Sequence, residues 1–231
     1  MRGPVALVGS GEYLPVMASL EASLLSGRAP RYVQIPTAAA PEGEESVGSW
    51  VALGIAQAER LGVEPVPVVV RDRQDADSPE LAALVAGAGL VYLSGGNPPF
   101  LARTLRGTLV WQAVLDAWEA GAALAGCSAG AMALTAWVPD IRQAEAEADP
   151  GLGVVPEVRV IPHFDRLMQW MPDLVDRFLD AAVPGVTLVG IDEETAMVGE
   201  GGRWTVHGEQ AVWVITTSGR DAFRAGAQVP L

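Results

Sequence analysis

The chain has 231 residues, of which 50% are hydrophobic and 19% are charged, a composition typical of a folded globular protein rather than a disordered one. Its 28 acidic and 15 basic side chains give a formal net charge of -13, which repels phosphate backbones and anionic lipids, so we expect no nucleic-acid partner and no membrane partner. The single cysteine excludes an internal disulfide framework and a thiolate zinc site, and the lack of a signal-peptide-like start or a membrane-length apolar run predicts a cytoplasmic protein.

Short apolar runs alternate with longer amphipathic stretches over most of the chain. The apolar runs predict strands, in chain order, at 4–8, 31–35, 65–70, 89–93, 122–126, 157–161 and 186–191. Helical periodicity fills the gaps at 14–26, 44–61, 79–87, 109–120, 129–137 and 165–182. Because the strand runs are continuously apolar, they indicate parallel strands buried on both faces. We therefore expect a single α/β domain over 1–231, with an open, doubly wound, mostly parallel sheet and helices on both faces.

The pattern changes near the C-terminal end. Short strands are expected at 196–199, 203–207 and 211–216, and glycine-containing turns separate them. This part of the chain predicts an antiparallel extension of the sheet. A small acidic segment at 143–150 is expected to form a loop or lid.

Polar residues follow the predicted strands directly, and open α/β sheets bind their ligands beyond the carboxyl ends of their strands. A serine, Ser128, follows the strand at 122–126, and a histidine, His163, follows the strand at 157–161. Three carboxylates follow the strand at 186–191, namely Asp192, Glu193 and Glu194. The convergence of these three residue types on one edge of the sheet indicates a hydrolytic site.

Ser128 lies in a Gly-x-Ser-x-Gly sequence, between an apolar strand and an alanine-rich helix. Glycines allow the strained strand-to-helix elbow that exposes a nucleophilic serine, and the helix N-terminus favours an anion. The alternative role for Ser128 is a helix cap. The backbone N–H groups of Ala129 and of Gly96, in a Gly-Gly turn after the strand at 89–93, are the candidate oxyanion donors.

The chain has two histidines, and His163 is the expected general base because His207 lies within the alternating C-terminal strands. The acid that orients His163 is left open among the three strand-end carboxylates, with Asp140 and Asp165 as more remote choices. Asn97 and Arg166 are the candidate substrate-binding side chains. No group of residues has metal-ligand spacing, so we expect no metal and no other cofactor.

The order serine, histidine, acid differs from the α/β-hydrolase order and matches class I glutamine amidotransferase domains, although those carry cysteine at the elbow. With serine in that scaffold, the chain resembles the S51 peptidases, which comprise aspartyl dipeptidase (peptidase E) and cyanophycinase. The resemblance covers most of the chain and is carried by the segments 93–97 (LSGGN), 125–131 (AGCSAGA), 161–164 (IPHF) and 190–196 (GIDEETA).

The resemblance implies Ser128 as nucleophile, His163 as base, Glu193 as orienting acid, and the N–H groups of Gly96 and Ala129 as oxyanion donors. It further implies a serine exopeptidase that cleaves short peptides, such as dipeptides with an aspartate-type residue. Two alternatives remain, a cyanophycinase-like or isoaspartyl hydrolase and a non-catalytic amidotransferase-like binding module. The chain is expected to be a monomer or a homodimer.

Overall fold

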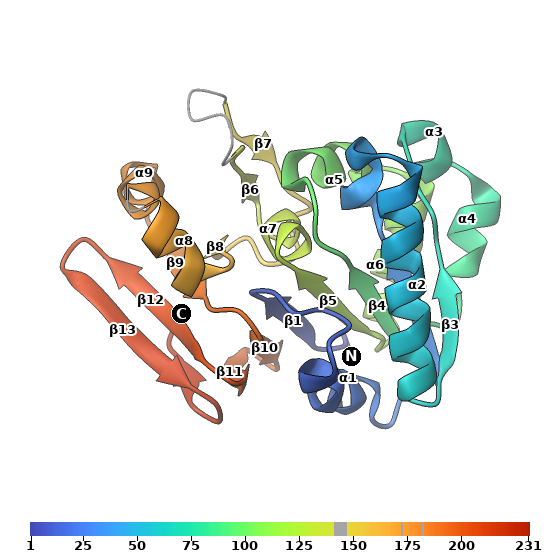
Figure 1. Cartoon of the computed structure of the whole chain (residues 1–231), viewed down its shortest axis with the longest axis horizontal. Helices are drawn as coiled ribbons and strands as arrows, with labels where there is room; N and C mark the ends of the chain where they lie inside the picture. Colours follow the sequence, from blue (N-terminus) through green and yellow to red (C-terminus); the bar gives the residue numbers. More distant parts are fainter. Residues whose placement is uncertain (141–146, 172, 182) are drawn as a thin grey trace.

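The computed structural model describes residues 1–140, 147–171, 173–181 and 183–231. Within these residues the main sheet has eight strands in the order β14-β11-β10-β1-β5-β4-β2-β3 (Figure 1). Its strands are β1 (Val5–Val8), β2 (Arg31–Ile35), β3 (Glu64–Pro67), β4 (Leu90–Leu93), β5 (Ala123–Cys127), β10 (Thr195–Glu200), β11 (Arg203–Gly208) and β14 (Gln228–Val229). Strands β1 to β5 are parallel to one another, and β10 continues the sheet antiparallel to β1.

A second sheet has the order β13-β12-β9-β8 within the described residues. It consists of β8 (Val158–Ile161), β9 (Thr187–Ile191), β12 (Ala211–Thr216) and β13 (Gly219–Arg224). Strands β8 and β9 are parallel, and β12 and β13 are added antiparallel to them. The short strands β6 (Trp137–Val138) and β7 (Asp149–Pro150) pair with each other.

Helices connect the strands and cover the sheets. They are α1 (Ala18–Leu25), α2 (Glu44–Arg60), α3 (Arg73–Ala76), α4 (Pro79–Leu84), α5 (Pro98–Leu105), α6 (Leu109–Glu119), α7 (Ala129–Leu134), α8 (Phe164–Trp170) and α9 (Leu174–Asp180), with 3-10 turns at Pro15–Met17 and Thr37–Glu42. Several begin at side-chain caps; for example, Asn97 Oδ1 accepts the N–H of Phe100 at 2.9 Å, and proline occupies the first turn of α5.

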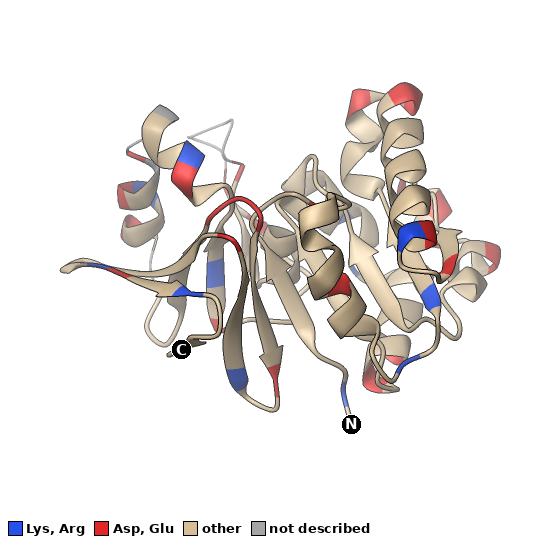
Figure 2. Cartoon of the chain, turned by 60° about the horizontal axis from the view of Figure 1, so that its bottom comes forward, with Lys and Arg blue, Asp and Glu red and all other residues tan. Residues whose placement is uncertain are grey.

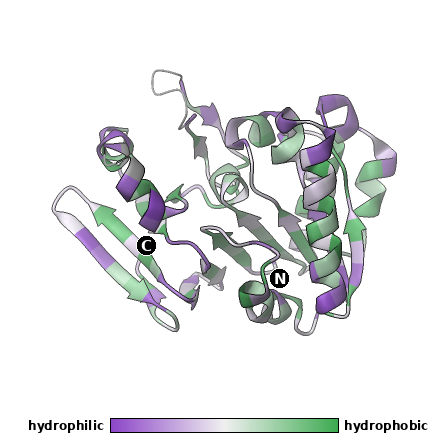
Figure 3. Ribbon diagram, in the orientation of Figure 1, coloured by the Kyte–Doolittle hydropathy of each residue, from purple (hydrophilic) through white to green (hydrophobic). Residues whose placement is uncertain are grey.

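The core lies on both faces of the main sheet because successive residues of a buried strand point to opposite sides. Leu7 and Val91 pack with α5, α6 and α7, whereas Ala6 and Tyr92 pack on the other face with α1 and α2. Figure 3 shows the central strands as predominantly hydrophobic, whereas hydrophilic positions lie on the outer helices, on loops and on the outer strand β13. Residues of α8, α9 and β12 form a third cluster over one face of the second sheet.

The expected fold class is confirmed, since the chain is α/β with a mixed, mostly parallel sheet and antiparallel C-terminal strands. One detail differs from the expectation. The strands predicted at 157–161 and 186–191 pair with each other and with β12 in a second sheet instead of extending the first.

Several element boundaries also differ. Helix α5 was not expected, the helix predicted at 129–137 ends at Leu134, and the stretch 165–182 contains two helices, α8 and α9. Of the predicted acidic loop at 143–150, residues 143–146 lie outside the described part, and Asp149 and Pro150 form β7.

Acidic positions are spread over helices and loops, and basic positions are isolated among them (Figure 2). None of the helices in the described part of the chain has the length and apolarity needed to cross a lipid bilayer.

Candidate active site

Ser128 occupies a strained turn between β5 and α7. Its backbone has φ 50° and ψ −106°, a region that non-glycine residues rarely adopt and that is found at functional elbows. The Ser128 N–H donates to the carbonyl of Val8, which ties the turn to β1 at 2.9 Å. The Ser128 side chain makes no capping hydrogen bond to α7, so the alternative role as a helix cap does not describe it.

The two glycines of the elbow are required by close backbone approach. A Cβ on Gly126 would lie 2.5 Å from the carbonyl carbon of Gly130. A Cβ on Gly130 would lie 2.3 Å from the carbonyl oxygen of Leu93 in β4. Both distances are shorter than any van der Waals contact allows, so the elbow packs against β4 only because these side chains are absent.

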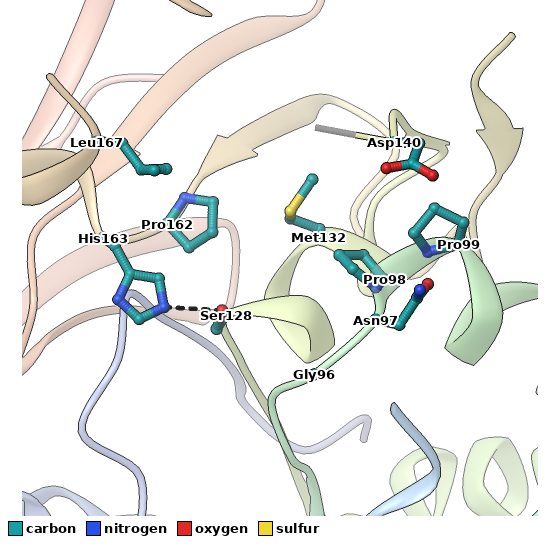
Figure 4. A pocket seen from close by; sticks show the side chains of 10 residues that line it. All are labelled: Gly96, Asn97, Pro98, Pro99, Ser128, Met132, Asp140, Pro162, His163 and Leu167. Carbon is teal, nitrogen blue, oxygen red and sulfur yellow. Dashed lines mark hydrogen bonds between the residues drawn. The ribbon is translucent and has the colours of Figure 1, made fainter. Parts of the chain in front are cut away.

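His163 lies at the start of α8, directly after β8, in a left-handed backbone conformation with φ 48° and ψ 38°. Its Nε2 atom lies 2.9 Å from Ser128 Oγ, and its Nδ1 atom lies 3.0 Å from Glu193 Oε1. Figure 4 shows the His163 ring directed at the Ser128 hydroxyl. Serine, histidine and carboxylate thus form one continuous chain of hydrogen bonds, with geometry suited to removing a proton from Ser128.

The other candidate carboxylates have different partners. Asp192 accepts the indole N–H of Trp213 at 3.0 Å and the N–H of Ala211 at 3.2 Å, and burial raises its pKa. Asp165 Oδ1 accepts the backbone N–H of Glu193 at 3.0 Å and so holds the backbone of the residue that faces His163.

Glu194 and Asp140 are the two remaining carboxylates that were candidates for orienting His163. The side chain of Glu194 lies beside Gly11, in the loop that follows β1. Asp140 lines the cavity beside Ser128, at the end remote from His163 (Figure 4). Of the five carboxylates considered, Glu193 is the one hydrogen-bonded to the His163 ring.

The two candidate oxyanion donors flank the elbow. Gly96 has φ 135°, and a Cβ there would lie 2.3 Å from the carbonyl oxygen of Ala38, so this turn also requires glycine. Across the described residues, the N–H groups of Gly96 and Ala129 have no protein acceptor. Both amides therefore keep an unused donor in the described part of the chain, and Gly96 also lines the cavity beside Ser128.

A cavity of about 170 Å³ opens beside Ser128 and His163 (Figure 4). Its walls combine apolar side chains with the polar groups of Asn97, Ser128, Asp140 and His163. The lining residues are Gly96, Asn97, Pro98, Pro99, Ser128, Met132, Asp140, Pro162, His163 and Leu167. The sequence did not predict the apolar part of this lining, because Met132 and Leu167 lie on helices, where such residues usually pack in the hydrophobic core.

Asn97 lines this cavity while its Oδ1 caps α5. Arg166 does not line it, and its Nε instead donates to Glu193 Oε2 at 3.3 Å and lies 3.6 Å from Asp165 Oδ2. The predicted substrate-binding arginine is thus placed behind the carboxylate that faces His163. Among the described residues, no group of three potential metal-ligating side chains is close enough together to hold an ion.

The amino-acid sequence of this chain is similar to those of known proteins. The cyanophycinase of Synechococcus elongatus is 32% identical over 168 residues, which cover 67% of this chain and 50% of the relative. The cyanophycinase of Trichormus variabilis is 28% identical over 202 residues, covering 82% of this chain and 65% of the relative. The chain therefore spans about half to two thirds of the length of these curated relatives.

Solved structures are similar over nearly the whole chain. A peptidase from an acI-B1 Actinobacterium has a TM-score of 0.92 and 42% identity, covering 100% of this chain and 98% of that one. A protein described as peptidase E, from Listeria monocytogenes EGD-e, shares the fold with a TM-score of 0.66 and 17% identity, covering 91% of this chain and 100% of that one. The sequence profile of Peptidase family S51 matches residues 5–207, and the chain belongs to this family.

Proposed function

We propose that this chain is a cytoplasmic serine-type exopeptidase that hydrolyses short peptides through an acyl-enzyme. The observation that carries the proposal is the unbroken hydrogen-bond chain from Ser128 through His163 to Glu193. Membership of a peptidase family and the strained elbow at Ser128 support it independently.

The geometry supports a two-step reaction. Ser128 Oγ attacks the peptide carbonyl carbon while His163 Nε2 accepts its proton. Glu193 accepts the Nδ1–H of His163, which keeps Nε2 free as the base and stabilises the imidazolium that forms. The N–H groups of Gly96 and Ala129 stabilise the oxyanion. The imidazolium then protonates the leaving amine, and water hydrolyses the ester at Ser128 by the same route.

The proposed substrates are short peptides with an aspartate-type residue. A cavity of about 170 Å³ next to Ser128 suits a small side chain or a chain terminus. Membership of Peptidase family S51 supports the aspartate-type residue that the resemblance to this family implies. Arg166, whose side chain is 52% exposed, would bind a substrate carboxylate only by sharing its contacts with Glu193 and Asp165.

A second candidate keeps the same machinery but cleaves β-linked aspartyl bonds, and the cyanophycinase relatives favour it. Parallel assays with α-linked and β-linked aspartyl dipeptides separate the two. Faster hydrolysis of the α-linked series supports the dipeptidase, and faster hydrolysis of the β-linked series supports the isoaspartyl alternative.

The nucleophile is tested by Ser128→Ala and the base by His163→Ala. Each should lower turnover of the cleaved dipeptide by several orders of magnitude, on the order of 10⁴-fold or more, because the three residues act as a unit. A fluorophosphonate probe should label wild-type Ser128 covalently, with mass spectrometry locating the adduct.

The matched control is His207→Ala, since His207 lies on β11 among the antiparallel strands. This variant should keep wild-type turnover. A chain that neither cleaves dipeptides nor reacts with the fluorophosphonate would instead be a non-catalytic binding module of the same fold.

A further inference from the structure

The loop after β1 carries a buried carboxylate that the proposed reaction does not use. Glu12 follows a Gly-Ser-Gly sequence at 9–11, and it is only 8% exposed although it is an acidic residue. Buried carboxylates are rare unless hydrogen bonds satisfy them. The partners of Glu12 therefore indicate why it is there.

Both oxygens of Glu12 accept hydrogen bonds from segments that form the site. Oε1 accepts the backbone N–H of Gly95 at 2.8 Å, and Oε2 accepts the thiol of Cys127 at 2.7 Å. Burial and the nearby Glu12 carboxylate raise the pKa of Cys127, so the thiol stays protonated and remains a donor. One side chain thus links the residue before Gly96 to the residue before Ser128.

Tyr13, the residue after Glu12, contacts the same turn after β4. Tyr13, fully enclosed and in a left-handed conformation with φ 66°, places its hydroxyl 2.7 Å from Ser94 Oγ. The loop after β1 therefore contacts two successive residues of the Ser94–Gly95–Gly96 turn, through Tyr13 and through Glu12. Two adjacent contacts fix both the position and the rotation of that turn.

The turn has little space in which to relax. A Cβ on Gly95 would lie 2.8 Å from Glu12 Oε1 and 3.6 Å from Ser128 Cβ, so the carboxylate, the turn and the nucleophile are packed together. The N–H of Gly95 is bonded to Glu12, whereas that of Gly96 has no acceptor in the described part of the chain. Holding the first amide restricts the movement of the second, which is the next amide along the same turn.

We propose that Glu12 is a positioning residue for the oxyanion hole, because it accepts the Gly95 N–H and thereby holds the Gly96 amide in place for the negative oxygen of the tetrahedral intermediate. This inference rests on the proposed serine-hydrolase function. It requires an acceptor at the position of Glu12 Oε1 and does not require the negative charge.

The test uses the second-order rate of Ser128 phosphonylation by a fluorophosphonate. In this step Ser128 Oγ bonds to phosphorus, fluoride leaves, and His163 takes the serine proton, while the phosphoryl oxygen occupies the oxyanion position. Three variants of the whole chain separate acceptor from charge. Glu12→Gln keeps the acceptor, Glu12→Asp keeps the charge but retracts it from Gly95, and Glu12→Ala removes both.

Glu12→Ala and Glu12→Asp should slow labelling by about 100-fold or more, as expected when an oxyanion donor is misplaced. Glu12→Gln should restore most of the wild-type rate. Circular dichroism and thermal unfolding check that each variant is folded, and the Gln/Asp comparison remains decisive if Glu12→Ala does not fold. With a cleaved dipeptide, the loss should lie in kcat rather than KM, because the oxyanion develops during the chemical step and is absent from the bound substrate.

Two results with the Glu12 variants would overturn the inference: Glu12→Asp as fast as wild type, or Glu12→Gln as slow as Glu12→Asp. Either would show that acceptor placement at Gly95 is not what matters. A wild-type chain that is not labelled at Ser128 would instead refute the proposed function, and the role of Glu12 would fall with it. Cys127→Ala keeps the Gly95 contact, so labelling of this variant should remain closer to wild type than that of Glu12→Ala; the reverse order would also overturn the inference.

Discussion

Asp192 and Glu193 are neighbours in sequence with opposite surroundings. Asp192 is 5% exposed and accepts hydrogen bonds from Trp213 and Ala211 of β12. Glu193 is hydrogen-bonded to the His163 ring, and 30% of its side chain is exposed. The two side chains diverge because consecutive residues at a strand end point to opposite sides. One therefore holds β12 in place, and the other is available to the histidine.

This divergence predicts different results for two conservative substitutions. Glu193→Gln should lower kcat by about 10³- to 10⁴-fold, because an amide cannot stabilise the imidazolium and can select the wrong tautomer. Asp192→Asn should leave kcat near wild type and lower the melting temperature, since it weakens the hydrogen bonds to β12. Steady-state kinetics and thermal unfolding measure the two effects. A large loss of kcat in Asp192→Asn would contradict this assignment.

Ser128 and His163 could be proposed from the sequence alone, because residue type, position after a strand and the scarcity of histidine all pointed to them, and the structure places the two side chains within hydrogen-bond distance. The residues alone left the acid open among neighbouring carboxylates, since the choice depends on which side each side chain takes at the end of β9. The role proposed for Glu12 could not be predicted from the sequence, because its hydrogen-bond partners lie 83 and 115 positions away in the chain. The sequence showed only a carboxylate in the loop after the strand predicted at 4–8.

At the scale of elements, the strand–turn–helix unit of β5 and α7 depends on backbone packing against β4. The carbonyl of Leu93 occupies the space where a side chain on Gly130 would lie. Helix α2, by contrast, carries an exposed glycine, Gly48, whose Cβ would meet nothing within 4 Å. The two positions form a matched pair, since the same substitution meets backbone in one and solvent in the other.

Gly130→Ala should destabilise the fold by about 1–3 kcal/mol or more and slow labelling of Ser128, because the elbow must move away from β4. Gly48→Ala should stabilise the fold by about 0.5–1 kcal/mol with unchanged labelling, because alanine has the higher helix propensity. Urea denaturation gives both values. Equal effects of the two substitutions would show that the elbow is not tightly packed.

The sequence predicted the strands better than the helices. The strands predicted at 31–35 and 89–93 match β2 and β4 to within one residue, because most of their side chains are buried in the sheet. Helix α5 was missed because consecutive prolines after Asn97 read equally as a turn, although in the structure they occupy its first turn behind the Asn97 cap. The division of strands between two sheets depends on long-range pairing, which local patterns do not encode.

At the scale of the whole molecule, one buried acid makes stability depend on pH. Glu21 on α1 is 1% exposed; its Oε2 accepts the Tyr32 hydroxyl, and its Oε1 has no donor among the described residues. Burial raises the pKa of Glu21 to about 7. Below the unfolded pKa both states are protonated, so there is no penalty; as pH rises to 7 the unfolded state alone releases the proton, and stability falls.

The resulting loss is on the order of 3 kcal/mol and is complete above pH 7. Glu21→Gln should therefore be more stable than wild type at pH 8, with a smaller difference at pH 5.5. Urea denaturation at the two pH values measures the change, and Glu59→Gln, at an exposed position on α2, is the control without this dependence. A stability difference that is the same at both pH values would contradict the prediction.

The site is divided between the two sheets. Ser128 and Gly96 follow strands of the main sheet, whereas His163 and Glu193 follow strands of the second sheet. The hydrogen bond between His163 and Glu193 therefore joins two residues that follow strands of the second sheet. The hydrogen bond between His163 and Ser128 instead joins the second sheet to the main sheet. Sliding one sheet past the other by about an ångström would part the serine from its histidine and leave each half intact. In the proposed reaction the alignment of the two sheets therefore matters as much as the side chains themselves, and substitutions between the sheets can change the reactivity of Ser128 without contacting it.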